Sequence, residues 1–145
     1  MNGLVAALVC GPRDGTGLEI VWKALDAARV DPRMPRFNML VTGSRRGTDL
    51  EAFDWAIHNE LVSAIYPAKW KTGKVGGKPE GMIRNGDMHR WSTPAVTLAF
   101  PGGDGTAGMM RISTSAGTPS WWWSQPDLLW VLDERCQGDG QLAWS

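Results

Sequence analysis

Apolar runs alternate along the chain with longer segments in which apolar residues recur at helical spacing. Five short runs, rich in aliphatic or aromatic residues, predict strands at 4–9, 37–42, 62–66, 95–100 and 120–123. Four segments with helical spacing predict helices at 17–29, 49–59, 82–91 and 106–116. Because strands that alternate with helices are typical of βαβ units, the pattern predicts a parallel sheet.

The predicted fold class is α/β: a single Rossmann-like domain with a doubly wound, mainly parallel sheet of about five to six strands and helices on both faces. Its core spans about residues 4–123, and residues 124–145 form a C-terminal extension. In that extension, residues 128–132 add an edge strand or a short helix. With 145 residues, of which 43% are hydrophobic, the chain is long enough to bury a core.

The chain holds nine tryptophans, three of them in succession at 121–123. On a strand, Trp121 and Trp123 face one side of the sheet and Trp122 the other, so both faces need cover. One interpretation is core packing beneath helices on both faces. The other places one of these side chains, or Trp130, at a self-association surface, because indoles are favoured at interface centres.

A glycine-rich loop follows the predicted strand 95–100 and begins a helix. It reads Pro101-Gly102-Gly103-Asp104-Gly105-Thr106. Glycines let a backbone approach a ligand closely, and the N–H groups of the first helical turn favour an anion. The spelling also suits an ordinary surface loop. Asp104 would repel a phosphate, so we expect it to point outward or to accept from a ribose hydroxyl.

Two other loops that follow predicted strands carry similar chemistry. They contain Gly11, Pro12, Arg13 and Asp14 in the first loop and Gly43, Ser44, Arg45 and Asp49 in the second. Since the carboxyl ends of parallel strands meet at one edge, the three loops outline one crevice. Each of these two loops leads into a capping-box spelling, at residues 16–19 and 48–51.

Several side chains of the loops and of the predicted helix 82–91 can be assigned a role. Arg13 is expected to bind the ligand or to organise the site. Arg84 and Asn85, on that helix, are expected to supply a cation and an amide. Asp49 stands at a helix start, where a structural cap and a ribose contact both suit it. Arg46 is expected to turn outward.

Five motifs, taken in order, resemble those of the YspA-like, cpYpsA-related branch of the SLOG superfamily, whose relatives include the DprA and "lonely guy" Rossmann-like proteins. They lie at residues 11–14, 43–49, 67–70, 81–85 and 100–106. The resemblance covers roughly residues 5–123. It implies a nucleotide or nucleotide-derived ligand, held by Gly11, Pro12, Arg13, Asp14, Gly43, Ser44, Arg45, Asp49, Arg84, Asn85, Pro101, Gly102, Gly103, Gly105 and Thr106.

Superfamily relatives sense nucleotide-derived or ADP-ribose-derived signals in bacterial and phage conflict systems. The resemblance therefore implies binding, by sensing or sequestration, and includes a phage or prophage protein that sponges an immune signal. The alternative is a nucleotide-processing hydrolase similar to the N-glycosidic phosphoribohydrolases, with Asp14 and Asp49 as candidate catalytic residues. The glycine loop of the "lonely guy" enzymes leads to a glutamate, and that position here is Met109, which favours binding over catalysis.

A third function class is DprA-like binding of single-stranded DNA. Fifteen basic and fifteen acidic residues give a net charge of zero, so nucleic acid is not the favoured partner. Trp70, Lys71 and Lys74 would supply a small stacking and phosphate patch. They belong to a segment, residues 69–80, that is either a solvated loop or a flap over an anionic ligand.

The sequence predicts no metal, because it has only two histidines and no cysteine or carboxylate at ligand spacing to them. No cofactor is expected. Cys10, beside a predicted buried strand, is interpreted as a small core residue. The start lacks a basic segment and a long apolar run, so no signal peptide or membrane span is expected. We expect a cytoplasmic protein, in the bacterial host's cytoplasm if phage-encoded, that forms a homodimer as superfamily members often do.

Overall fold

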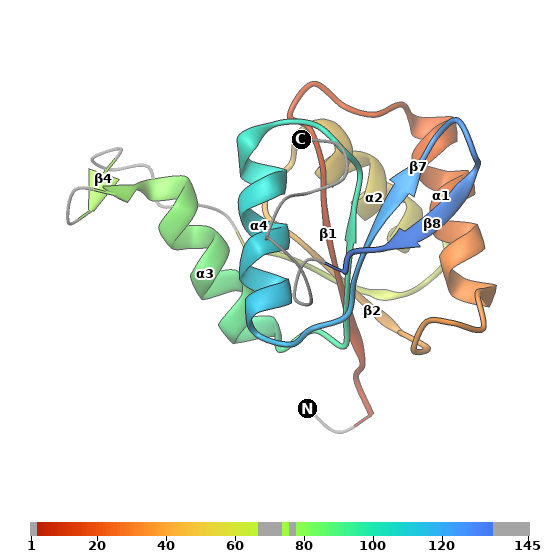
Figure 1. Ribbon diagram of the computed structural model, residues 1–145. Coiled ribbons are helices and arrows are strands. Elements are labelled where there is room, and N and C mark those ends of the chain that lie inside the picture. The colour runs from red at the N-terminus through yellow and green to blue at the C-terminus, as the bar shows by residue number, and fades with distance from the viewer. Residues whose placement is uncertain (1–2, 67–73, 76–77, 135–145) are drawn as a thin grey trace.

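The computed structural model describes residues 3–66, 74–75 and 78–134 and contains a six-stranded sheet in the order β3-β2-β1-β6-β7-β8 (Figure 1). The strands are β1 (Ala6–Cys10), β2 (Met39–Thr42), β3 (Val62–Ile65), β6 (Val96–Ala99), β7 (Ser120–Ser124) and β8 (Leu129–Leu132). The first five run parallel, and β8 pairs antiparallel with β7. The predicted single α/β domain with a mainly parallel sheet is confirmed, and residues 128–132 supply an edge strand.

Four helices cover the sheet, namely α1 (Leu18–Val30), α2 (Gly47–His58), α3 (Glu80–Ser92) and α4 (Asp104–Ser115). A short hairpin of β4 (Lys74–Val75) and β5 (Lys78–Pro79) precedes α3. Three helices begin two residues before their predicted starts, because their first turns are polar and apolar spacing does not mark them. No helix in the described ranges is long and apolar enough to cross a membrane.

The helices lie on both faces of the sheet, as a doubly wound fold requires (Figure 1). Side chains of β1 alternate between the two faces: Ala7 and Val9 pack with α1 and α2, while Leu8 packs with α3 and α4. The consecutive tryptophans of β7 alternate in the same way. Trp121 and Trp123 belong to the α1 side and Trp122 packs on the other, which confirms the predicted alternation.

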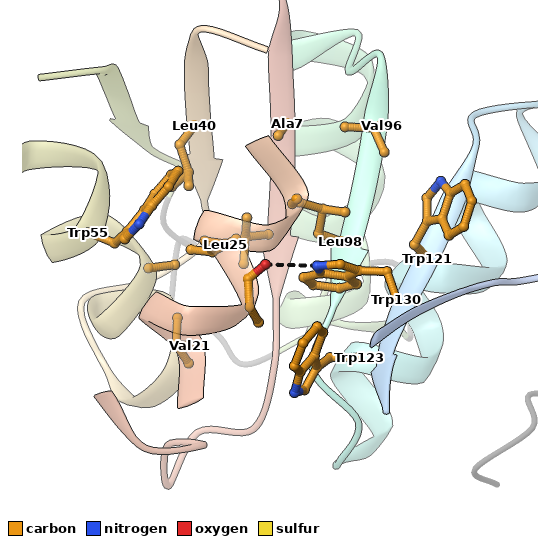
Figure 2. Packing of buried hydrophobic residues seen from close by; sticks show 14 of the residues in the cluster. Ala7, Val21, Leu25, Leu40, Trp55, Val96, Leu98, Trp121, Trp123 and Trp130 are labelled. Atoms are coloured by element: carbon orange, nitrogen blue, oxygen red, sulfur yellow. Dashed lines mark hydrogen bonds between the residues drawn. The ribbon is translucent and has the colours of Figure 1, made fainter. Parts of the chain in front are cut away.

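Trp130 on β8 is a core residue, with 1% of its surface exposed. Its indole Nε1 donates a hydrogen bond to the carbonyl oxygen of Ala24 on α1, at 2.8 Å (Figure 2). Its ring meets Phe100 and Trp123 edge to face, with ring centroids 5.4 and 5.3 Å apart. Trp121 and Trp123 are buried as well. Core packing is therefore the correct interpretation of these three indoles, and they do not supply a self-association surface.

The two capping-box spellings do not cap their own helices. Neither α1 nor α2 has a side-chain hydrogen bond at its N-cap. Instead, the Glu51 carboxylate of α2 accepts hydrogen bonds from the N–H groups of Thr16 (2.9 Å) and Gly17 (3.1 Å), so it caps α1 from the neighbouring helix. Thr48 is buried inside the first turn of α2, where its hydroxyl pairs with that of Thr16 at 2.7 Å. The contact between α1 and α2 thus replaces both local caps.

Candidate functional site

The strand order changes direction at β1, which has β2 on one side and β6 on the other. In an open α/β sheet, the loops that leave the strands at such a point diverge and leave a crevice beyond the carboxyl ends. A cleft of about 660 Å³ lies there. It is lined by the loops after β1, β2 and β6, by the end of β3 and by one residue of α3.

Every predicted ligand-binding residue except Asn85 and Pro101 lines this cleft. The lining residues are Gly11, Pro12, Arg13, Asp14, Gly43, Ser44, Arg45, Arg46, Asp49, Ile65, Arg84, Gly102, Gly103, Asp104, Gly105 and Thr106. Three loops that are far apart in the sequence are therefore brought together, as the parallel-sheet argument predicts.

The glycine loop after β6 leads directly into α4. Gly102 and Gly103 have φ angles of 136° and 79°, which L side chains rarely adopt, and Gly103 is the N-cap of the helix. Gly105 follows in the first turn, and a Cβ added there would meet no atom within 4 Å. Since the first N–H groups of a helix have no partner inside it, the α4 terminus presents hydrogen-bond donors beside open space.

The loop after β1 is held firmly against α2. The carbonyl oxygen of Pro12 accepts hydrogen bonds from the N–H groups of Gly15 (3.1 Å) and Thr48 (3.2 Å). A side chain on Gly102 would approach the ring of Pro12 to 3.2 Å, so the β1 and β6 loops also touch. The backbone beneath Arg13 is thus fixed from two sides.

Asp49 lies in the first turn of α2 and bonds back to the loop that precedes it. Its Oδ2 accepts hydrogen bonds from the Gly43 N–H at 3.2 Å and from the Ser44 hydroxyl at 3.1 Å. Its Oδ1 is buried and has no hydrogen-bond partner. Burial raises the pKa of the Asp49 carboxyl to about 6, although the Arg84 charge and the hydrogen bonds from Ser44 and Gly43 pull the pKa down. The N-cap of α2 is Arg46, so Asp49 does not cap the helix in the usual sense.

Arg84 reaches the cleft from α3 and lies across the backbone of Gly43. A Cβ on Gly43 would overlap Nη1 of the guanidinium, so a side chain at this position would have to displace the end of Arg84. Burial lowers the pKa of Arg84, and the Asp49 charge opposes that shift. Its Nε is buried without a hydrogen-bond partner. Among the described residues, no ion pair within 4.0 Å joins Arg84 to Asp49.

Asn85 lies behind the glycine loop and not in the cleft. It is 7% exposed, and its Nδ2 donates to the carbonyl oxygen of Gly105 at 3.2 Å. This hydrogen bond therefore holds the first turn of α4 in place. The sequence prediction assigned Arg84 and Asn85 to the ligand together, as a cation and an amide, but consecutive helical residues point about 100° apart.

Met109, at the position that resembles the "lonely guy" glutamate, is 1% exposed and belongs to the core on the α4 side of the sheet. Cys10 is buried in the same core, and burial raises the pKa of its thiol, with the Asp49 charge acting in the same direction. The thiol therefore stays protonated, which confirms the core interpretation. No group of three or more His, Cys, Asp or Glu side chains within the described ranges is arranged to hold a metal ion.

Asp104 lines the cleft, which is consistent with the expected alternative of a contact to a ribose hydroxyl. Two other cleft residues were missed or misplaced by sequence reasoning. Arg46, expected to turn outward, lines the cleft. Ile65 is the last residue of β3, and its position at a carboxyl strand end next to β2 is the signal that would have identified it. Residues 67–73, with the motif at 67–70 and the Trp70 and Lys71 patch, lie outside the described residues, as do residues 76–77.

The fold and the cleft together define a Rossmann-like α/β domain with a polar site at the switch point of its sheet. The family model YAcAr, described as YspA, cpYpsA-related SLOG family, matches residues 6–73. That match, over a little under half of the chain, confirms the SLOG resemblance drawn from the motifs. None of the curated proteins matches the chain.

Two solved structures share the fold. The UDP-GlcNAc 2-epimerase from Neisseria meningitidis, bound to UDP-GlcNAc, is 11% identical with a TM-score of 0.50, and the match covers 83% of this chain and 32% of that one. A UDP-N-acetylglucosamine 2-epimerase is also 11% identical, with a TM-score of 0.52 and coverages of 83% and 33%. The chain spans about a third of the length of each, and at this identity the likeness shows the fold alone.

Proposed function

We propose that this chain binds a nucleotide or an ADP-ribose-derived ligand in the cleft and does not turn it over. One observation carries the proposal: the open N-terminus of α4 faces a cleft that arginines enter from three other elements. Helix N-termini attract anions, and guanidinium groups pair with phosphate oxygens. A volume of about 660 Å³ lies within the range of small-molecule sites.

The charges of the cleft suit a ligand that is only partly anionic. Its basic and acidic side chains are Arg13, Arg45, Arg46 and Arg84 against Asp14, Asp49 and Asp104. The arginines attract phosphates and the aspartates repel them, whereas sugar hydroxyls can donate hydrogen bonds to the aspartate carboxylates. The SLOG family match supports a nucleotide-related ligand, and the epimerase from Neisseria meningitidis, similar in fold, was solved bound to the nucleotide sugar UDP-GlcNAc.

Binding without turnover suits a protein that senses or sequesters a nucleotide-derived signal. A thioether in the core at position 109 supplies no carboxylate to the cleft, which supports binding over the chemistry of the "lonely guy" enzymes. The proposal includes sequestration of an immune signal by a phage protein. Native mass spectrometry of freshly purified protein should show a co-purifying nucleotide by its mass.

The sharpest test of the site compares two glycines of α4. Gly105→Val places a side chain in the space proposed for the phosphate, and Gly108→Val makes the same change on the same helix away from the cleft. At both positions an added Cβ meets nothing within 4 Å, and valine is a better helix former than glycine, so both variants should fold. By calorimetry, Gly105→Val should weaken ADP-ribose binding at least tenfold.

Gly108→Val serves as the matched control and should bind ADP-ribose within twofold of the natural sequence. Equal affinities for both variants would mean that the ligand does not approach the α4 terminus. If the natural sequence binds neither ADP-ribose nor ADP and carries no nucleotide after purification, the proposed function is wrong.

The second candidate function is hydrolysis of an N-glycosidic bond, and the state of Asp49 favours it. A carboxyl group in a ligand cleft with a pKa of about 6 can give or take a proton near neutral pH. If the protein only binds, a bound nucleotide should be recovered intact after heat denaturation. Accumulation of free base or ribose phosphate over many turnovers, abolished in Asp49→Asn or Asp14→Asn, would establish the hydrolase instead.

A further inference from the structure

Two buried polar atoms without hydrogen-bond partners belong to residues that line the cleft. They are Oδ1 of Asp49 and Nε of Arg84, which carry opposite charges and interact electrostatically without forming an ion pair. A buried polar group without a partner costs roughly 1–3 kcal/mol. Such groups are rare in native proteins, and a bound ligand is one reason that they persist.

Oδ1 of Asp49 and Nε of Arg84 require different hydrogen-bonding groups in a common partner. The carboxylate oxygen accepts a hydrogen bond, whereas the Nε–H donates one, so a group that satisfies both must donate and accept. An ionised phosphate only accepts, and the Asp49 charge repels it. A hydroxyl does both, and the neighbouring hydroxyls of a ribose offer two such groups side by side.

We infer that Asp49 and Arg84 form a subsite for a sugar hydroxyl of the ligand, while the phosphates lie at the α4 terminus. This inference rests on the proposed function. It states which part of the ligand binds to the Asp49 and Arg84 pair and which part binds to the α4 terminus. Asp49 accepts from the hydroxyl through Oδ1, and the Nε–H of Arg84 donates to the hydroxyl oxygen. Asp49 is thereby a specificity-determining residue, because a ligand that lacks the sugar leaves its carboxylate unsatisfied.

Access to this subsite requires a side chain to move, because both atoms are shielded from water in the unbound protein. Arg84 is the side chain that the geometry offers, since it is long and its guanidinium lies across Gly43. The rest of the subsite is already held in place. Gly43 and Ser44 fix the other oxygen of Asp49, so the carboxylate cannot turn away from the cleft without losing two hydrogen bonds.

The test separates sugar recognition from phosphate recognition by using ADP-ribose and pyrophosphate as probes. Asp49→Asn keeps the shape of the side chain but removes its charge. We expect ADP-ribose affinity to fall ten- to a hundredfold, as for loss of a charged hydrogen bond, with pyrophosphate affinity unchanged or increased. The melting temperature should not fall, because the exchanged carboxylate is buried with one oxygen unpaired.

Asp54→Asn is the control, since Asp54 is an exposed residue of the same helix that does not line the cleft. It should bind both probes like the natural sequence. Equal losses for ADP-ribose and pyrophosphate in Asp49→Asn would assign Asp49 a structural role, and tighter binding of both probes would make it only a repelling charge. Either result overturns the inference but leaves the proposed function intact, whereas failure of the natural sequence to bind either probe rejects both.

Discussion

The buried tryptophans of the core and the cleft at the carboxyl ends of the strands differ in whether their buried polar atoms have hydrogen-bond partners. Trp130 and Trp55 bury their rings and still donate from Nε1, to the Ala24 carbonyl oxygen at 2.8 Å and to Asp26 at 2.9 Å. In the cleft, by contrast, Asp49 and Arg84 each keep a buried polar atom without a partner. These two indoles complete their hydrogen bonds where the protein packs, whereas Asp49 and Arg84 leave theirs open where we propose that it binds.

This difference teaches where stability and binding reside in the same small domain. Completed hydrogen bonds and close packing lower the free energy of the folded state, and unpaired buried groups raise it. Trp121 and Thr42 are exceptions on the packed side, because the buried Nε1 of Trp121 and the buried hydroxyl of Thr42 have no partner. The Arg33 guanidinium lies 4.7 Å from the Trp121 ring centroid, so a cation–π contact stabilises the ring face instead.

The largest expected effect tests the packed side of the comparison. Trp130→Ala should lower the free energy of unfolding by about 3–5 kcal/mol, because it empties a site that is 1% exposed and removes the hydrogen bond to Ala24. Urea unfolding measures this loss. Trp91→Ala, at a tryptophan that is 49% exposed, is the control and should cost less than about 1 kcal/mol. Comparable losses in the two variants would contradict the assignment of Trp130 to the core.

The next prediction tests whether the buried Asp49 carboxylate of the cleft lowers the free energy of unfolding at neutral pH. The folded protein raises the pKa of Asp49 from 3.8 to about 6, so it binds this proton more tightly than the unfolded chain does. The resulting stability is fully present below pH 3.8 and is lost as the pH rises through 6. The loss amounts to about 2–3 kcal/mol, since each pKa unit corresponds to about 1.4 kcal/mol.

Urea unfolding of the natural sequence and of Asp49→Asn at pH 4 and pH 7.5 measures this contribution. The difference in stability between the two proteins should change by the expected amount across the range, in favour of Asp49→Asn at the higher pH. Asp54→Asn, exposed on the same helix, should follow the natural sequence. Parallel curves for all three proteins would show that Asp49 titrates alike in the folded and unfolded chains.

The smallest expected effect sharpens the binding side. Arg84→Ala should weaken ADP-ribose binding about ten- to a hundredfold, as expected for a charge-assisted donor worth roughly 1.5–3 kcal/mol. Arg111→Ala, at an exposed arginine of α4 that does not line the cleft, should leave the affinity within twofold. Calorimetry compares the two. If Arg111→Ala lost as much affinity as Arg84→Ala, general charge and not the cleft would attract the ligand.

Much of the fold could be predicted because it depends on local patterns. Strand and helix spacing is periodic, and in a parallel sheet the loops after β1, β2 and β6 meet at one edge whatever their distance in sequence. That topological rule predicts that Gly11, Gly43 and Gly105 lie around one cleft, as they do in the structure. The alternation of Trp121 and Trp122 between the two faces follows from the same strand geometry.

The side-chain partners could not be predicted, because they are made between elements. The position of Glu51 predicts a cap on its own helix, but its carboxylate accepts from the start of α1. Asn85 follows a cleft residue in the sequence, but its amide donates to the carbonyl oxygen of Gly105. In both cases the observed partner belongs to a neighbouring element. Spacing along one helix carries no information about which neighbour packs against it.

The sequence by itself determined the order of elements, the faces of the sheet and the edge where the three loops converge, since these follow from periodicity and chain topology. Only the tertiary structure decided the chemical state of the cleft. In the sequence, Asp49 is an ordinary acid of a first helical turn. Burial raises its pKa to about 6, and the charge of Arg84, which comes from α3, opposes that shift. Burial and charge act through space, so they exist only once the chain has brought these distant residues together.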